Sequence, residues 1–398
     1  MGNKHTVRFE PVGIEIEADE DETVLNAAFR QGVMLMHGCK EGQCSACKSF
    51  LLDGEVDLDK YSTFALPDFE EAEGFTLLCR AHAYSDLEVE LINYDEEVLH
   101  GGTPPRTVQT SVTAVAPLTH DIRLLRLKVE DEEEFSFRAG QYVDIRIPGH
   151  EDDHRSFSMA NTTSTPGELE FMIKLYPGGR FSGLLDEDKI TVGESLQVTG
   201  PYGVFTLRGS SPRRLVFIGG GAGMAPIVCL LRSMAETGAE RAATYYYGAR
   251  TEPDLFHLEE LEELGGQLPD FTFVPALSEA GDGDGWAGET GLITEVVDRL
   301  EDDLTEVDAY LCGPPRWSTP RSRRSRPRAC RRSTSISTSS PPPSSSERSL
   351  HGHGKPRQGT QRPQAGVHRR RGGSEGVPVL DQPQLQLLHP AQTSCDGV

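Results

Sequence analysis

Alternation of apolar and polar residues opens the chain and predicts a first small sheet. HTVRFEPVGIEIEAD, residues 5–19, keeps this alternation on both sides of a Pro and a Gly, which predicts a β-hairpin. ETVLNAAFRQG, residues 22–32, instead places its apolar residues on one helical stripe and ends at a glycine, a typical helix stop. KSFLLDGEVDL, residues 48–58, predicts a second hairpin, and LEVELINY, residues 87–94, a closing strand.

The pattern changes twice further along the chain. Residues 100–106, HGGTPPR, have the composition of a linker. Residues 108–207 show short alternating runs broken by Gly and Pro, which predicts an antiparallel β-barrel. After residue 212, continuous apolar strands alternate with helices, which predicts a parallel sheet with helices on both faces. The predicted fold class is therefore multidomain, α+β and α/β. The predicted boundaries are 1–97, 98–106 (linker), 107–210, 211–315 and 316–398.

Charge separates the last part of the chain from the rest. Of the 398 residues, those from 316 to 398 carry 15 Lys and Arg against 4 Asp and Glu, which leaves 24 against 58 for residues 1–315. So acidic a protein is not expected to bind nucleic acid or an anionic membrane, and it suits a basic protein surface as partner.

The N-terminus and the apolar runs bear on location. MGNKHTVRFEP lacks the apolar core of a signal peptide, and the chain has no run of 18 apolar residues. We therefore expect a cytoplasmic protein with no membrane span. Because thiols stay reduced in that compartment, the cysteines need a role other than disulfide formation.

Four cysteines near the N-terminus have the spacing of metal ligands. Cys39, Cys44 and Cys47 form C-x4-C-x2-C and Cys79 follows at a distance, which is the plant-type spacing for a [2Fe-2S] cluster. Zinc is the alternative, but structural zinc sites usually pair two C-x2-C units. Cys229 lies in an apolar helical stretch and is predicted to be a core residue. With HGCKEGQCSACKSFLLDGEV and LLCRAH, residues 1–95 resemble a plant-type ferredoxin of the β-grasp fold.

Two segments of the predicted barrel favour a flavin nucleotide. In RSFSMAN, Arg155 can fork onto a phosphate, Phe157 offers a flat apolar face and Ser158 a hydroxyl donor. YPGGRFSGLL predicts a glycine turn before a helix, where free N–H groups favour a pyrophosphate. The candidate residues of this turn are Gly178, Gly179 and Ser182.

Together these segments resemble the ferredoxin-NADP reductase superfamily. The resemblance implies that Arg155 and Ser182 bind the FAD pyrophosphate and that Ser158 hydrogen-bonds near the flavin N5. Phe157 replaces the usual Tyr of that superfamily. This change should keep the stacking and lose a hydroxyl contact.

The predicted parallel sheet carries a nicotinamide nucleotide signal. LVFIGGGAGMAPI is typical of a strand, a phosphate-binding turn and a helix start, and its spacing Gly221-x-Gly223-x-x-Pro226 resembles that of the same superfamily. Arg250 follows the next strand and is expected near the adenosine end of the cofactor. Because acidic residues follow Arg250 directly and a 2′-phosphate needs more cations, NADH is favoured over NADPH.

The strand ending in LCGPP completes that site by resemblance. The superfamily brings a Cys-Gly beside the nicotinamide at this point, and we carry that role to Cys312 and Gly313. Ser158 and Cys312 are thus the predicted catalytic residues.

The order ferredoxin, FAD, NAD over residues 5–315 resembles the reductase components of bacterial multicomponent monooxygenases, in particular the propane and methane branch. This resemblance implies electron transfer from NADH through FAD and [2Fe-2S] to a di-iron hydroxylase. Two alternatives remain open at this point. One is the reductase of a Rieske dioxygenase, and the other is a non-enzymatic electron carrier with a broken NAD domain.

The basic tail departs from this family after Pro315. If the DNA is read one base earlier, the codons of residues 316–318 can encode the residues that follow Pro315 in the family. The codons of residues 334–341, read in the same way, can encode the residues with which the family ends. We interpret residues 316–398 as out-of-frame translation, non-native or disordered, and a genuine basic interaction tail is the alternative. Loss of the family's last strand would leave residues 308–312 as a sheet edge.

Overall fold

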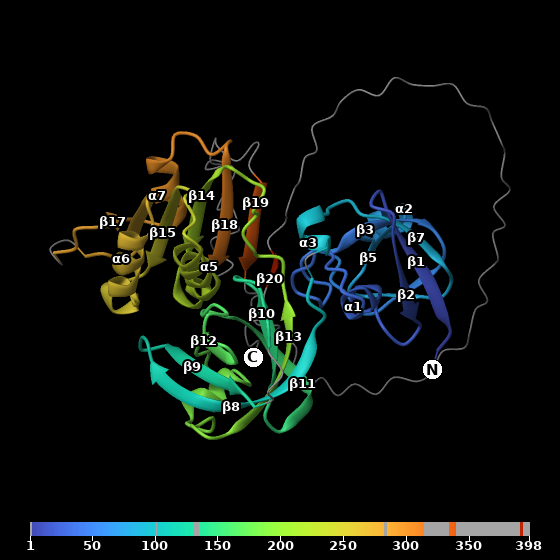
Figure 1. Cartoon of the computed structure of the whole chain (residues 1–398), viewed down its shortest axis with the longest axis horizontal. Helices are drawn as coiled ribbons and strands as arrows, with labels where there is room; N and C mark the ends of the chain where they lie inside the picture. Colours follow the sequence, from blue (N-terminus) through green and yellow to red (C-terminus); the bar gives the residue numbers. More distant parts are fainter. Residues whose placement is uncertain are drawn as a thin grey trace, which may run out of the picture.

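The computed structural model describes residues 2–100, 102–130, 135–281, 285–313, 334–339 and 391–392. They form three large sheets, one after another along the chain, each with its own core (Figure 1). This arrangement confirms the predicted fold class, α+β and α/β. In the part of the chain that the structure describes, no helix is long and apolar enough to cross a membrane.

The first unit consists of short elements around one core. Its elements are β1 (Lys4–Glu10), β2 (Ile14–Asp19), α1 (Val24–Arg30), β3 (Lys48–Asp53), β4 (Val56–Leu58), α2 (Asp68–Glu73), β5 (Phe75–Leu77), β6 (Ala81–Ala83), β7 (Leu87–Glu90) and α3 (Glu96–His100). Five strands form a sheet in the order β2-β1-β7-β3-β5, and β4 pairs with β6 in a small second sheet. The side chain of Thr23 caps α1 by accepting a hydrogen bond from the Asn26 amide at 3.3 Å.

The first predicted hairpin is confirmed and the second is wrong. β1 and β2 are antiparallel neighbours in a register that joins Lys4 to Asp19. β3 and β4 do not pair with each other, because β5 and β7 take both neighbouring places of β3 and β4 leaves to join β6. Gly54, at φ 104°, makes the turn between them. Local alternation predicts a strand, but it does not fix the strand's partner.

The second unit is the predicted antiparallel sheet. Its elements are β8 (Arg106–Pro117), β9 (Ile122–Val129), β10 (Tyr142–Ile147), β11 (His150–Ser158), β12 (Glu168–Lys174), α4 (Ser182–Asp186) and β13 (Ser195–Tyr202). The strand order is β11-β10-β13-β8-β9-β12, and all neighbours are antiparallel. Alternate residues such as Val143, Phe171 and Val198 are fully buried in its core.

The third unit is the predicted parallel sheet. Its elements are β14 (Arg214–Gly219), η1 (Gly221–Gly223), α5 (Met224–Thr237), β15 (Ala243–Ala249), η2 (Glu252–Asp254), α6 (Leu258–Gln267), β16 (Phe271–Leu277), β17 (Glu289–Thr290), α7 (Ile293–Leu300), β18 (Val307–Gly313), β19 (Thr334–Ser339) and β20 (Ala391–Gln392). The order is β17-β16-β15-β14-β18-β19-β20. α5 and α6 share one core and α7 another, on opposite faces of the sheet. Cys229 is the predicted core residue, fully buried in α5.

The expected exposed edge at β18 is not observed. β19 pairs with β18 in parallel, in a register from Asp308 opposite Thr334 to Gly313 opposite Ser339, so β18 is an interior strand. The backbone of residues 334–339 thus takes the place next to β18 (Figure 1). Apart from β19 and β20, the tail from residue 316 onward lies outside the described residues, and the predicted reading-frame slip stays a prediction.

Candidate functional site

The structure brings the four predicted cluster cysteines together. Cys39, Cys44, Cys47 and Cys79 are each 8% exposed or less, although they come from two segments of the first unit. The Cys39 amide donates to the Cys44 sulfur at 3.3 Å, and the Gln43 amide donates to the Cys39 sulfur at 3.2 Å. Amides aimed at sulfur stabilise thiolates, so this donor set fits an iron–sulfur cluster.

Hydrogen bonding between the thiols also shifts their pKa values in different directions. The Cys39 thiol donates to Cys44 and lowers the pKa of Cys44 to about 7 against the effect of burial. The same interaction raises the pKa of Cys39, and burial raises it further. A hydrogen bond with Cys79, together with burial, raises the pKa of Cys47. The thiols therefore interact directly in two pairs, as convergent ligands do.

Left-handed residues curve the cluster loop, residues 38–47. Lys40, Gly42 and Ser45 have φ of 58°, 67° and 61°. At Gly42 a β-carbon would lie 2.7 Å from the Tyr61 β-carbon, so only glycine fits there. The loop is thereby wrapped tightly around the thiols.

The two predicted flavin segments lie side by side in the second unit. Phe157 on β11 packs against Phe181, which precedes α4, with ring centroids 5.0 Å apart. The Ser182 hydroxyl is fully buried and accepts a hydrogen bond from the Tyr176 amide at 3.2 Å, which fixes the turn. Gly178 has no heavy atom within 4 Å of the β-carbon position, so the turn faces open space. These residues fit a flavin nucleotide.

The predicted nicotinamide residues also meet. Gly221 and Gly223 form the turn between β14 and α5, and Pro226 is buried in the first turn of α5. A β-carbon at Gly223 would lie 2.4 Å from the Cys312 carbonyl oxygen, so the end of β18 lies directly against the turn. Gly313 is the last residue of that strand.

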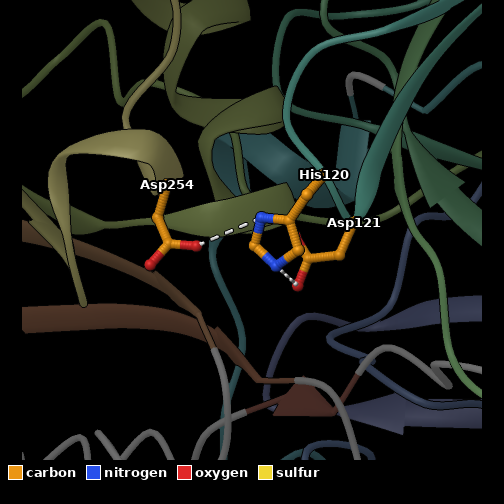
Figure 2. A group of neighbouring side chains, drawn as sticks. All are labelled: His120, Asp121 and Asp254. Atoms are coloured by element: carbon orange, nitrogen blue, oxygen red, sulfur yellow. Dashed lines mark ion pairs between the residues drawn. The ribbon is translucent and has the colours of Figure 1, made fainter.

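Arg250 belongs to a charged group that links the second and third units. Its guanidinium lies 2.8 Å from the Asp254 carboxylate and 3.7 Å from Asp121. Figure 2 shows His120 between the same two carboxylates, 3.5 Å from Asp121 and 3.7 Å from Asp254. Because Lys174 also pairs with Asp121, the two carboxylates are neutralised by cations, and the group is an ion-pair network rather than a metal site.

A contact between the first and second units was not predicted from the sequence. Lys40, in the cluster loop, forms a buried ion pair with Asp144 on β10, in the second unit. The two residues are 104 positions apart, and nothing in either local pattern distinguishes Lys40 from an exposed lysine.

A thiolate loop, a flavin-binding turn and a dinucleotide turn on three successive units define the class of iron–sulfur flavoprotein reductases. Family models agree along the chain: a 2Fe-2S iron-sulfur cluster binding domain matches residues 7–84, an oxidoreductase FAD-binding domain 109–207 and an oxidoreductase NAD-binding domain 217–319. These matches confirm the predicted cofactors, [2Fe-2S], FAD and NADH.

Relatives narrow the class further. The reductase component of propane 2-monooxygenase from Rhodococcus jostii is 55% identical over 79% of this chain and 85% of its own length. The phenol 2-monooxygenase reductase component DmpP from a Pseudomonas strain is 36% identical over 78% and 87%. In crystal, the Amycolatopsis cytochrome P450 reductase GcoB is similar at a TM-score of 0.69 and 31% identity, covering 78% of this chain and 91% of that one. The chain belongs to the family of monooxygenase reductase components and is an oxidoreductase that passes electrons from NADH through FAD to a [2Fe-2S] cluster.

Proposed function

We propose that the chain is the reductase component of a di-iron alkane monooxygenase of the propane type. This proposal rests on the difference in sequence identity between groups of relatives. Propane 2-monooxygenase reductases are 52–55% identical to the chain, whereas the phenol 2-monooxygenase reductase is 36% and a toluate dioxygenase component 32% identical. The lower identity of the toluate dioxygenase component argues against a Rieske dioxygenase as partner. A non-enzymatic carrier is disfavoured because β14, α5 and β18 keep the dinucleotide turn intact.

Each cofactor has proposed ligands in this chain. Cys39, Cys44, Cys47 and Cys79 hold the cluster. Arg155 and the 176–182 turn hold the FAD pyrophosphate, with Phe157 against the ring system and Ser158 near its N5. Gly221, Gly223, Pro226, Arg250, Cys312 and Gly313 hold NADH. When bound, these groups convert the two-electron hydride of NADH into single electrons for the hydroxylase.

An anaerobic absorbance spectrum before and after addition of NADH tests this function. We expect flavin and iron–sulfur bands that both bleach. Bands that NADH leaves unchanged, in a protein that dithionite does bleach, would contradict the proposed NADH-dependent reductase.

Arg155→Ala is expected to weaken FAD retention by about 10- to 100-fold, because a charge-assisted bond to phosphate is worth roughly 1.5–3 kcal/mol. Flavin fluorescence released on gel filtration measures it. Arg146→Ala removes an exposed arginine from the neighbouring strand β10 and should leave FAD bound. Equal loss from both variants would argue against a phosphate contact at Arg155.

Asp254→Asn is expected to raise kcat/KM for NADPH about tenfold, with little change for NADH. The Asp254 carboxylate neutralises Arg250 and would repel a 2′-phosphate, and removing one such charge is worth about 1.4 kcal/mol. Glu263→Gln, an exposed carboxylate on α6, is the control. An unchanged preference would place the adenosine ribose elsewhere.

The face that meets the hydroxylase is proposed to be the acidic side of the first unit. Phe64 and Phe69 are 79% and 64% exposed there, on a segment rich in carboxylates. That segment contacts the cluster loop, since the Ser62 amide donates to the Gly42 carbonyl at 3.0 Å and the Ser45 hydroxyl to the Ala65 carbonyl at 2.9 Å. Exposed aromatics beside a redox centre favour a docking surface.

Replacing Phe64 and Phe69 together by Ser is expected to lower electron delivery to a propane monooxygenase hydroxylase about tenfold or more. NADH-dependent ferricyanide reduction should stay unchanged. Val192→Ser, which removes a side chain 66% exposed on the second unit, is the matched control. Unchanged product formation by the double variant would exclude this face.

A further inference from the structure

The junction between the cluster loop and the second unit is built around one buried cation. The Lys40 side chain is 13% exposed and the Asp144 side chain 9%, and their ion pair joins the first unit to β10. The Lys40 ammonium also lies 3.2 Å from the centroid of the Tyr202 ring, on β13. A desolvated ammonium with both a carboxylate and an aromatic face as partners is strongly held in place.

Two further hydrogen bonds hold His37 and Gly38, just before the first cluster cysteine, to the second unit. The Tyr142 hydroxyl donates to the Gly38 carbonyl at 3.0 Å, and the Gly203 amide donates to the His37 Nε2 at 2.9 Å. All four atoms belong to buried groups. The chain on the N-terminal side of Cys39 is therefore fixed to β10 and to the end of β13.

Asp144, the partner of Lys40 in the second unit, lies on β10, which pairs with the strand that carries the proposed flavin residues, β11. Asp144 lies opposite Ser156 in the β10–β11 register, between the pairs that Ile145 makes with Arg155 and Val143 with Phe157. The Ser156 hydroxyl donates to Asp144 at 2.5 Å. Burial opposes ionisation of Asp144, but Lys40, His154 and the Ser156 hydroxyl together outweigh burial and lower the pKa of that carboxyl. The contact between Lys40 and Asp144 therefore joins the residue after Cys39 to the strand that pairs with the flavin segment.

We propose that Lys40 is a positioning residue for electron transfer between the two cofactors: its ion pair with Asp144 holds the cluster loop against the strands that carry the flavin. The inference rests on the proposed cofactor sites. The step concerned moves one electron, which the reduced flavin loses and the oxidised cluster gains, and no covalent bond forms or breaks. Its rate depends on the separation and orientation of the two sites, which this junction sets.

The test compares Lys40→Met and Asp144→Asn with Lys48→Met in the cofactor-loaded protein. Lys48 is a fair control because it also follows a cluster cysteine and forms a part-buried ion pair, but with Glu70 of the same unit. Hydrogen exchange followed by mass spectrometry reports the junction without reference to activity. Both junction variants should lose protection in residues 36–44 and 142–146 together, whereas Lys48→Met should retain it.

The kinetic arm separates the two halves of the electron path. Reduction of ferricyanide by NADH reports the flavin, and reduction of cytochrome c reports the cluster, an assignment that the cluster-free Cys47→Ser variant verifies. We expect cytochrome c reduction to fall about tenfold or more in both junction variants, with ferricyanide reduction unchanged. The charge-reversed double variant, Lys40→Asp with Asp144→Lys, should recover part of the loss.

Several results would overturn the proposal. These are cytochrome c reduction at the wild-type rate in Asp144→Asn, equal loss for both acceptors, or unchanged exchange at the junction. If Lys40→Met lost its cluster, Asp144→Asn alone would test the proposal, because it removes the same ion pair without changing the cluster loop. Failure of the proposed cofactor sites gives a different result, since the wild-type protein would then reduce neither acceptor with NADH.

Discussion

Replacing Cys47 by serine is expected to abolish the [2Fe-2S] cluster and to lower NADH-dependent cytochrome c reduction by more than about 100-fold. Cys47 is 5% exposed and its thiol interacts with that of Cys79, so its sulfur lies among the other predicted ligands. Flavin reduction by NADH should persist, because the flavin and nicotinamide segments belong to the other two units. Iron content and the electron paramagnetic resonance signal of the reduced protein measure the loss.

Cys229→Ala is the matched control for that substitution. Cys229 is also a fully buried thiol, and its sulfur donates to the Asn161 carbonyl at 3.0 Å, but it lies in α5, away from the cluster loop. The variant should keep its iron and lose some stability from the small cavity. A Cys47→Ser protein with a full cluster would show that the cluster does not need a thiol at this position.

Local signals predicted most of the candidate site. The spacing of Cys39, Cys44 and Cys47 follows from one loop that must surround a metal centre, so a sequence window contains nearly the whole ligand set. The glycine turn after β14 is local for the same reason, since a strand, a turn and a helix are consecutive. Such signals are readable because the atoms that perform the chemistry are neighbours in the chain.

Non-local pairings could not be predicted in the same way. The partner of β4 is β6 and not β3, because pairing depends on the whole sheet and not on the alternation within either strand. The Lys40–Asp144 pair and the contact of Arg250 with Asp121 each join residues far apart in sequence. Long charged side chains are usually exposed to solvent. Only the packing of the units against one another therefore shows that Lys40 and Arg250 form contacts between units.

The place of β19 shows a further limit. The sequence departs from its family after Pro315, and the loss of the last strand predicts an exposed edge. The backbone of Thr334–Ser339 nevertheless pairs with β18 from Asp308 to Gly313. Parallel pairing uses backbone groups that every residue except proline supplies, so a segment of foreign composition can occupy a sheet position.

Gly223→Ala is expected to lower the rate of flavin reduction by NADH by about 100-fold, while the cluster and the flavin stay bound. The added β-carbon would lie 2.4 Å from the Cys312 carbonyl oxygen and 2.7 Å from its carbon, both rigid backbone atoms, so the turn and the end of β18 must separate. That displacement changes both parts of the proposed nicotinamide site at once. Stopped-flow absorbance under anaerobic conditions measures the rate.

The control for this steric argument is Gly266→Ala, in α6. No heavy atom lies within 4 Å of its β-carbon position, so the methyl group should leave NADH reduction unchanged and stabilise the helix by roughly 0.5–1 kcal/mol. Reduction by dithionite should be normal in both variants, because it bypasses the nicotinamide site. A Gly223→Ala protein that NADH reduces at the wild-type rate would mean that close contact between the turn and the Cys312 backbone is not needed for hydride transfer.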